Sequence, residues 1–116
     1  MKTKLIIYHN PKCSKSREAC SLVKTEGREF EIREYLKNPL SEAEIIDLLK
    51  KLRMKAEELV RKKEPLYKDN YAGKKVSEKE WVSILARNPI LIERPVIVLG
   101  NKAVIGRPTS TIEKLF

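Results

Sequence analysis

The sequence predicts an α/β fold whose elements run β-α-β, a helical insertion and β-β-α around a mixed four-stranded sheet. Three observations predict it. The first third alternates strand, helix and strand patterns, the middle third is helical between proline-marked breaks, and the last third holds a hairpin followed by a short helix. Because 116 residues is the size of one domain, we expect a single domain over residues 1–116, with the helical insertion at about 40–88.

The first third predicts a βαβ unit. Lys4–Tyr8 is a short apolar strand, stopped by Asn10-Pro11. Ser14–Glu26 carries a narrow apolar stripe of helical spacing, and Gly27 then suits the position just after a helix end. Apolar and charged residues alternate over Phe30–Tyr35, which predicts a second strand. Two strands joined by a helix pair in parallel through a right-handed crossover.

The middle third predicts helices. Capping boxes at Ser41–Glu44 and Ser77–Glu80 each precede apolar residues at helical spacing, so each begins a helix. The second of these helices should stop before Asn88-Pro89. Between them we expect a short helix around Ala56–Lys62 and an irregular stretch over Glu64–Val76, which contains a proline and a glycine.

The last third returns to strands. Val96–Leu99 and Ala103–Ile105 flank Gly100-Asn101-Lys102, which is favourable hairpin chemistry. A third capping box at Ser110–Glu113 predicts a terminal helix that runs through Leu115.

Composition excludes several classes of protein. The net charge of +9 is spread along the chain, and of the aromatic residues only Tyr67 and Tyr71 lie close together, so we do not expect nucleic-acid binding. A small anion or an acidic partner protein fits the same charge. Purely apolar runs reach at most four residues, and the apolar stretch after the basic start is too short for a secretory signal. We therefore expect a cytoplasmic protein that does not enter a membrane.

Cys13 is the main candidate for chemistry. It stands where the first strand pattern ends and the first helix pattern begins. A helix N-terminus presents free N–H groups and partial positive charge, which favour a thiolate and bind anions. Lys12, Lys15 and Arg17 add positive charge where acidic residues would favour the helix. The alternative is a buried structural cysteine beside a solvated basic turn.

The hairpin supplies a second candidate site. Its register places Arg94 opposite Arg107, and each arginine precedes a proline. Two guanidinium groups at the open end of one hairpin repel each other unless an anion lies between them, and arginine suits bidentate binding of a tetrahedral oxyanion. The alternative is that Glu93 pairs with one arginine while the other is solvated.

The remaining candidates are ambiguous on the residues alone. Arg61 fits a cation that complements a helix C-terminus. His9 is a possible proton carrier or thiolate partner, or incidental, and Cys20 fits a small core residue. One histidine and two cysteines cannot form a metal site, so we expect no metal. Seven residues apart on one helix, Cys13 and Cys20 lie about 10.5 Å apart, beyond the roughly 7 Å that a disulfide spans.

Four segments, in this order, resemble the glutaredoxin-coupled arsenate reductase family. They are Tyr8-His9-Asn10-Pro11-x-Cys13-x-x-Ser16-Arg17, Leu59-Val60-Arg61-Lys62, Asn88-Pro89-Ile90-Leu91-Ile92-x-Arg94-Pro95 and Gly106-Arg107-Pro108. The resemblance covers essentially the whole chain. It implies a thioredoxin-like fold with a helical insertion, in agreement with the element order predicted above.

The resemblance also implies roles for individual residues. Cys13 would attack arsenate, while Arg61, Arg94 and Arg107 would hold the oxyanion. Pro95 would be the cis-proline beside the thiol that thioredoxin folds share. Four further residues of the first motif are expected to support the thiol: His9, Lys12, Ser16 and Arg17.

The implied reaction reduces arsenate to arsenite, with glutathione as co-substrate, glutaredoxin as the resolving partner and no bound cofactor, in a monomer. Two relatives of the same fold remain as alternatives. One is a glutathione-dependent thiol reductase. The other is an Spx-like regulator that binds RNA polymerase, a branch that often carries Cys-x-x-Cys at the first helix; here Ser16 takes the second position, which argues against an internal redox switch.

Overall fold

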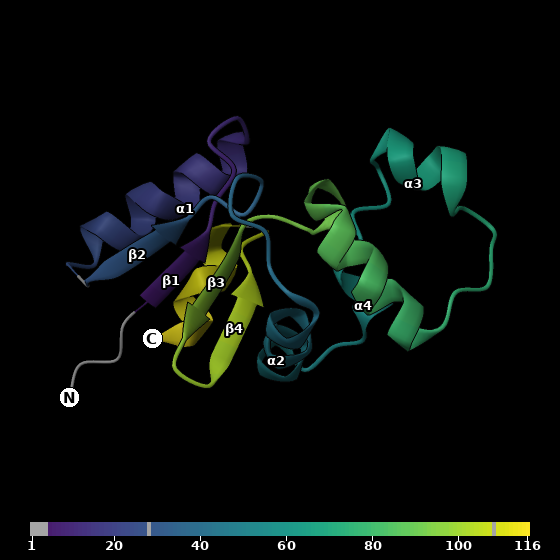
Figure 1. Ribbon diagram of the computed structural model, residues 1–116. Helices are drawn as coiled ribbons and strands as arrows, with labels where there is room; N and C mark the ends of the chain where they lie inside the picture. Colours follow the sequence, from purple (N-terminus) through teal and green to yellow (C-terminus); the bar gives the residue numbers. More distant parts are fainter. Residues whose placement is uncertain (1–4, 28, 108) are drawn as a thin grey trace. The chain divides into compact units, whose positions relative to one another are not determined.

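The computed structural model describes residues 5–27, 29–107 and 109–116 (Figure 1). The chain forms two compact units: residues up to Asn38 together with Arg94–Phe116, and Pro39–Glu93. The second unit occupies the stretch predicted as the helical insertion. Among the described residues, none of the helices has the length and apolar character needed to cross a membrane.

The first unit is built on a mixed four-stranded sheet in the order β2-β1-β3-β4. β1 pairs in parallel with β2 and antiparallel with β3, and β3 pairs antiparallel with β4. This confirms the predicted fold class, including the parallel βαβ unit. The strands are β1 (Leu5–Tyr8), β2 (Phe30–Arg33), β3 (Val96–Leu99) and β4 (Lys102–Ile105).

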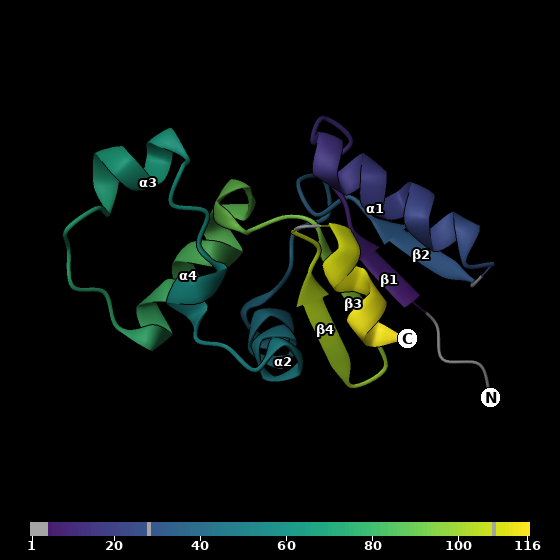
Figure 2. The ribbon, with the colours of Figure 1, turned by 180° about the vertical axis from the view of Figure 1, so that it is seen from behind.

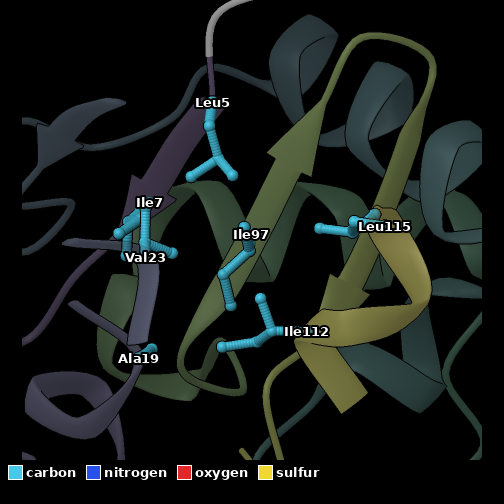
Figure 3. Packing of buried hydrophobic residues seen from close by; sticks show 7 residues of the cluster. All are labelled: Leu5, Ile7, Ala19, Val23, Ile97, Ile112 and Leu115. Atoms are coloured by element: carbon cyan, nitrogen blue, oxygen red, sulfur yellow. The ribbon is translucent and has the colours of Figure 1, made fainter. Parts of the chain in front are cut away.

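One face of this sheet carries the core of the first unit. The helix α1 (Ser14–Thr25) and the terminal 3₁₀ helix η3 (Thr109–Leu115) both cover that face (Figure 2). Alternate strand positions point to the same side, so Leu5 and Ile7 of β1 meet Ile97 of β3 there. Figure 3 shows the buried cluster: Leu5, Ile7, Ala19, Val23, Ile97, Ile112 and Leu115. Each large aliphatic side chain buried in it stabilises the fold by about 1.5–3 kcal/mol.

The end of α1 and the turn of the β3–β4 hairpin both lie at glycines, as predicted. α1 closes with Glu26 N donating to the carbonyl of Leu22 at 3.2 Å and Gly27 N donating to that of Lys24 at 3.1 Å. Gly27 has φ +70°, the left-handed backbone that glycine adopts without a steric penalty. In the hairpin, Leu99 lies opposite Lys102 and Val96 opposite Ile105, so β4 begins at Lys102, one residue earlier than predicted, in the register that places Arg94 opposite Arg107.

The second unit is helical. The predicted capping box of α2 is complete, since Ser41 Oγ accepts from Glu44 N at 3.1 Å and Ser41 N donates to Glu44 Oε1 at 3.0 Å. Ser77 Oγ accepts from Glu80 N at 3.2 Å and so caps α4. The helices of this unit are α2 (Glu42–Leu52), η1 (Ala56–Leu59), α3 (Pro65–Asn70), α4 (Glu78–Arg87) and η2 (Pro89–Leu91).

Three local predictions are wrong. Glu64–Val76 is not irregular, because α3 fills Pro65–Asn70; Pro65 stands at its first position, where a missing N–H costs nothing, so the proline starts a helix. The helix expected over Ala56–Lys62 ends at Leu59, because Val60 forms a β-bridge with Ile92.

The third error concerns the capping box predicted for the last helix. The 3₁₀ helix η3 begins at Thr109, so Ser110 lies inside it and is not its N-cap. Two other predicted positions, Lys4 at the start of the first strand and Pro108 in the last motif, lie outside the described residues.

Candidate active site

Cys13 is the N-cap residue of α1. Its backbone is extended, with φ −94° and ψ 121°, and its carbonyl accepts from Arg17 N at 3.1 Å. The turn before it is closed by Asn10, whose carbonyl accepts from Cys13 N at 2.9 Å and whose Oδ1 accepts from Lys12 N at 3.0 Å. The residue is 8% exposed. A nearly buried thiol therefore lies at the amino end of a helix.

Ser16, a residue of α1, holds the loop before the helix in place through hydrogen bonds. Its side chain is fully buried. Its Oγ accepts from Asn10 N at 3.0 Å and lies 2.6 Å from His9 Nδ1. His9 N donates to the carbonyl of Arg33 at 2.9 Å, which ties the same loop to the end of β2. Burial lowers the pKa of His9, while Glu34 raises it and Arg17 lowers it further.

Arg94 and Arg107 lie together at the thiol, as the hairpin register predicted. Arg107 Nε donates to the carbonyl oxygen of Arg94 at 2.7 Å, and Arg107 Nη2 donates to Cys13 Sγ at 3.4 Å. The Arg94 guanidinium also hydrogen-bonds Cys13, an interaction that raises the pKa of Arg94 against the lowering effect of burial. The Arg94–Pro95 peptide bond is cis, which confirms the geometry expected of Pro95.

Gly106 allows this arrangement to pack. A Cβ at this position would lie 2.9 Å from Ile97 Cδ1 and 3.0 Å from Pro95 Cγ. Gly106 N also donates to the carbonyl of Pro95 at 2.8 Å, which joins the loop that carries Arg107 to the cis-proline. The glycine of the last motif is therefore explained by the close approach of two segments beside the site.

The electrostatics of the site favour a thiolate at Cys13. Burial alone would raise its pKa. Hydrogen bonds from the backbone N–H groups of Ser16 and Lys15 and from the Arg94 side chain, together with the charge of Arg107, outweigh burial, so the pKa of Cys13 is lowered. Cys20 behaves in the opposite way, because burial raises its pKa. Both cysteines are free thiols.

The other predicted residues have different surroundings. Arg61 belongs to the second unit, where its Nε donates to Glu64 Oε1 at 3.2 Å in a largely buried ion pair. Lys15 Nζ lies 3.5 Å from Glu18 Oε2, and Arg17 Nη1 donates to the carbonyl of Pro11 at 3.3 Å. Lys12 is exposed. The described structure thus brings Arg94 and Arg107 to the sulfur and engages Lys15 and Arg17 with other groups.

Contributors of three kinds to this site were not predicted from the sequence. Asn10 closes the turn through its side chain, and its place before a proline is typical of such turns. The amide groups of Lys15 and Ser16 act through the backbone, which leaves no signal in residue type. Tyr35 is buried and interacts electrostatically with Arg94, which raises the pKa of that guanidinium; the alternation of the second strand pattern indicated only burial for this tyrosine.

No group of three or more His, Cys, Asp or Glu side chains could hold a metal ion in the part of the chain that the structure describes. The site combines a thiol that can act as a nucleophile, fixed N–H donors and two guanidinium groups that can hold an anion. A mixed sheet, a cysteine at the start of the first helix and a cis-proline beside it define a thioredoxin-like protein.

The family follows from comparison with known proteins. The model of the ArsC family matches residues 8–115, so the chain belongs to the ArsC family. It is 48% identical over 108 residues to YfgD of Escherichia coli K12, an uncharacterized protein, with 91% of each chain covered. It is 39% identical over 110 residues to an arsenate reductase of Haemophilus influenzae, covering 93% of this chain and 95% of that one.

A solved structure has the same fold over the full length of this chain. The arsenate reductase of Vibrio cholerae superposes with a TM-score of 0.94 at 34% identity, and all of both chains is covered. The fold and the family expected from the resemblance are thereby confirmed.

Proposed function

We propose that this protein is an arsenate reductase in which the Cys13 thiolate attacks arsenate, with glutathione and glutaredoxin supplying the electrons. The observation that carries the proposal is the contact of Arg107 Nη2 with Cys13 Sγ at 3.4 Å, because it puts an anion-binding group and a nucleophile at one point. Relatives at 39% and 37% identity that bear the name arsenate reductase support the substrate.

The two arginines suit the proposed substrate. A tetrahedral oxyanion gains charge on its oxygens when sulfur attacks, and fixed guanidinium groups stabilise that charge without reorganisation. The Arg94 carbonyl holds Arg107, so the position of that guanidinium is set before substrate binds. Arg61 is proposed as a third ligand on the resemblance, and an oxyanion would then compete with Glu64 for its guanidinium.

The proposed steps balance in atoms and electrons. The Cys13 thiolate forms a sulfur–arsenic bond as one arsenic oxygen leaves as water. Glutathione then binds arsenic as a second arsenic oxygen leaves as water, and a glutaredoxin thiolate attacks the glutathione sulfur and removes it as a mixed disulfide. Two thiol sulfurs are oxidised in that disulfide, and arsenic accepts the electron pair. Water then cleaves the bond between Cys13 and arsenic(III), which restores the thiol and releases arsenite. His9, Lys12, Ser16 and Arg17 support the thiol loop, and the protein needs no bound cofactor. We further propose a cytoplasmic monomer, in keeping with the chemistry of a reduced thiol.

A coupled assay tests the proposal. NADPH consumption should require arsenate, glutathione and glutaredoxin together, and omission of any one should abolish it. Turnover that does not need arsenate would instead make the protein a glutathione-dependent thiol reductase. Stoichiometric capture of RNA polymerase with no turnover would make it a regulator. The buried and hydrogen-bonded Ser16, which stands where a second redox cysteine would be, argues against an internal redox switch in such a regulator.

A further inference from the structure

The second unit, Pro39–Glu93, contains a cavity of its own. Its volume is about 800 Å³, and every residue that lines it belongs to α2, the loop after α2, η1 or the start of α4. The volume lies within the range of about 300–1,000 Å³ typical of small-molecule sites. No residue of the proposed thiol chemistry lines it, so the cavity requires an explanation separate from the reductase site.

The floor of the cavity is apolar. It is formed by two residues of α2, one of the following loop and one of α4: Ile46, Leu49, Met54 and Val82. Ile46 remains 46% exposed, whereas Leu49 and Val82 beside it are buried. A half-exposed aliphatic side chain in the lining of a cavity favours an apolar ligand over water.

The charged residues that line the cavity, which we call its rim, are four cations and three carboxylates, a net charge of +1. Its four cations are Lys50, Arg53, Lys55 and Lys79. Within the described ranges, no ion pair and no side-chain hydrogen bond engages any of them. Because these cations outnumber the three carboxylates and none of them is paired, the rim favours an anionic group on the ligand.

Of the three acidic residues on the same rim, Glu42, Glu58 and Glu78, the last two bond to backbone groups. Both carboxylate oxygens of Glu78 accept from Ala56 N at 3.0 Å, and Glu58 Oε1 accepts from Lys55 N at 3.2 Å. These two carboxylates are therefore oriented toward amides and not toward the ammonium and guanidinium groups of the rim.

Two of these cations stand where local helix energetics disfavour them. Arg53 ends α2 with φ 57° and ψ 47°, a left-handed conformation that is usual for glycine and strained for arginine. Lys79 lies in the first turn of α4, where the helix dipole favours acidic residues. An anion bound at the rim would interact favourably with both side chains and would account for their placement.

We propose that this cavity binds a small amphipathic carboxylate, with its aliphatic or aromatic body on the apolar floor and its carboxylate at Arg53 and the neighbouring lysines. The size of the site favours a small ligand over a protein, because eleven residues line the cavity, about half of the 20–30 residues that a stable protein interface uses on each side. The net charge of +9 disfavours a second copy of the chain.

The experiment is an amide-resolved NMR titration of the full chain with octanoate. Saturable shifts are expected at Leu49, Met54 and Val82. Octan-1-ol has the same body without the charge and should bind at least tenfold more weakly, and acetate, which lacks the body, should produce no shifts at the floor. Raising the salt concentration should weaken octanoate more than octan-1-ol.

Arg53→Gly separates ligand binding from folding. Glycine tolerates the left-handed backbone, so the variant should melt at or above the wild-type temperature while its affinity for octanoate falls fivefold or more. Lys51→Ala is the matched control: Lys51 pairs with Asp47 at 3.0 Å and does not line the cavity, so affinity should stay within twofold.

Four outcomes would overturn the proposal. They are equal affinity for octanoate and octan-1-ol, shifts spread over the surface without saturation, unchanged octanoate affinity in Arg53→Gly, and a dimer in sedimentation equilibrium whose interface covers the floor residues. Loss of arsenate reduction in the coupled assay would not bear on this site, because none of its residues takes part in the thiol chemistry.

Discussion

Arg107 Nη2 donates to Cys13 Sγ across 3.4 Å, although 94 positions separate the two residues in the sequence. The same guanidinium bonds the carbonyl of Arg94 through Nε. One side chain thus joins the end of the hairpin to the start of α1, and it brings cationic charge to the sulfur that the helix amides already favour as a thiolate.

The first prediction concerns the nucleophile. Cys13→Ser should abolish arsenate reduction, because serine cannot supply a thiolate, whereas Cys20→Ser should retain more than half of kcat. The coupled NADPH assay measures both. Equal losses in the two variants would indicate a relay between the cysteines and would contradict a single nucleophile.

The second prediction concerns the arginines. Arg94→Lys and Arg107→Lys should each lower kcat/KM tenfold or more, because loss of a charge-assisted contact costs roughly 1.5–3 kcal/mol. Lysine keeps the charge but loses the planar fork. Arg87→Lys, at an exposed arginine of α4, is the matched control and should leave kcat/KM unchanged. Full activity in both site variants would show that these arginines do not bind the substrate.

The third prediction concerns the hydrogen bond between Ser16 and the loop that precedes α1. Ser16→Ala should lower the free energy of unfolding by about 1–3 kcal/mol, because it leaves the buried Asn10 N–H without an acceptor. Urea unfolding measures the change. Ser14→Ala, at an exposed position of the same helix, should change stability by less than about 0.5 kcal/mol. Similar values for the two variants would show that the Ser16 bond does not hold the loop.

The fourth prediction is a pH dependence. Although burial opposes ionisation, the amides of Ser16 and Lys15 and the two arginines hold the pKa of folded Cys13 below that of an unfolded thiol, which is about 8.5. The thiolate therefore stabilises the fold fully above the unfolded pKa, and this stabilisation is lost as the pH falls through the lowered folded pKa.

Unfolding in urea at a series of pH values checks this prediction. The stability advantage of wild type over Cys13→Ser should grow as the pH rises toward about 8.5. For Cys20, whose pKa is raised by burial, the advantage of wild type over Cys20→Ser should instead shrink above that pH. A flat difference for Cys13 would mean that its pKa is unchanged on folding.

The elements whose positions are set by local spacing could be predicted from the sequence. The two-residue loop at Gly100-Asn101 determines the β3–β4 register, and that register alone placed Arg94 opposite Arg107. The capping box at Ser41 likewise determined the start of α2. In these cases the relevant forces act between residues that are close in sequence.

Other features depended on tertiary structure or on the backbone. Pro65 was interpreted as a helix breaker, yet a proline both ends helices and starts them, and its sequence context did not distinguish the two uses. The charges of Lys15 and Arg17 were expected to act on Cys13, but these side chains bond to Glu18 and to the Pro11 carbonyl. Two of the groups that lower the thiol pKa are the backbone N–H groups of Ser16 and Lys15, which residue type does not reveal.

The role of Arg61 stays a prediction that rests on the resemblance. Within the second unit its guanidinium pairs with Glu64, three positions away, a contact that i, i+3 spacing could have suggested. The sequence offered a helix C-terminus as the alternative partner for this cation, and the structure supplies a carboxylate.

The central claim is that Cys13 is a thiolate beside an oxyanion held by arginines, and timed iodoacetamide labelling with peptide mapping tests it most directly. At pH 6 to 7 Cys13 should react well before Cys20, although Cys13 is the more buried of the two, because only its pKa is lowered. Arsenate, or sulfate as a non-reacting mimic, should slow the reaction at Cys13, and high salt should weaken this protection. If Cys20 reacts first, or if neither oxyanion changes the rate at Cys13, the claim is wrong.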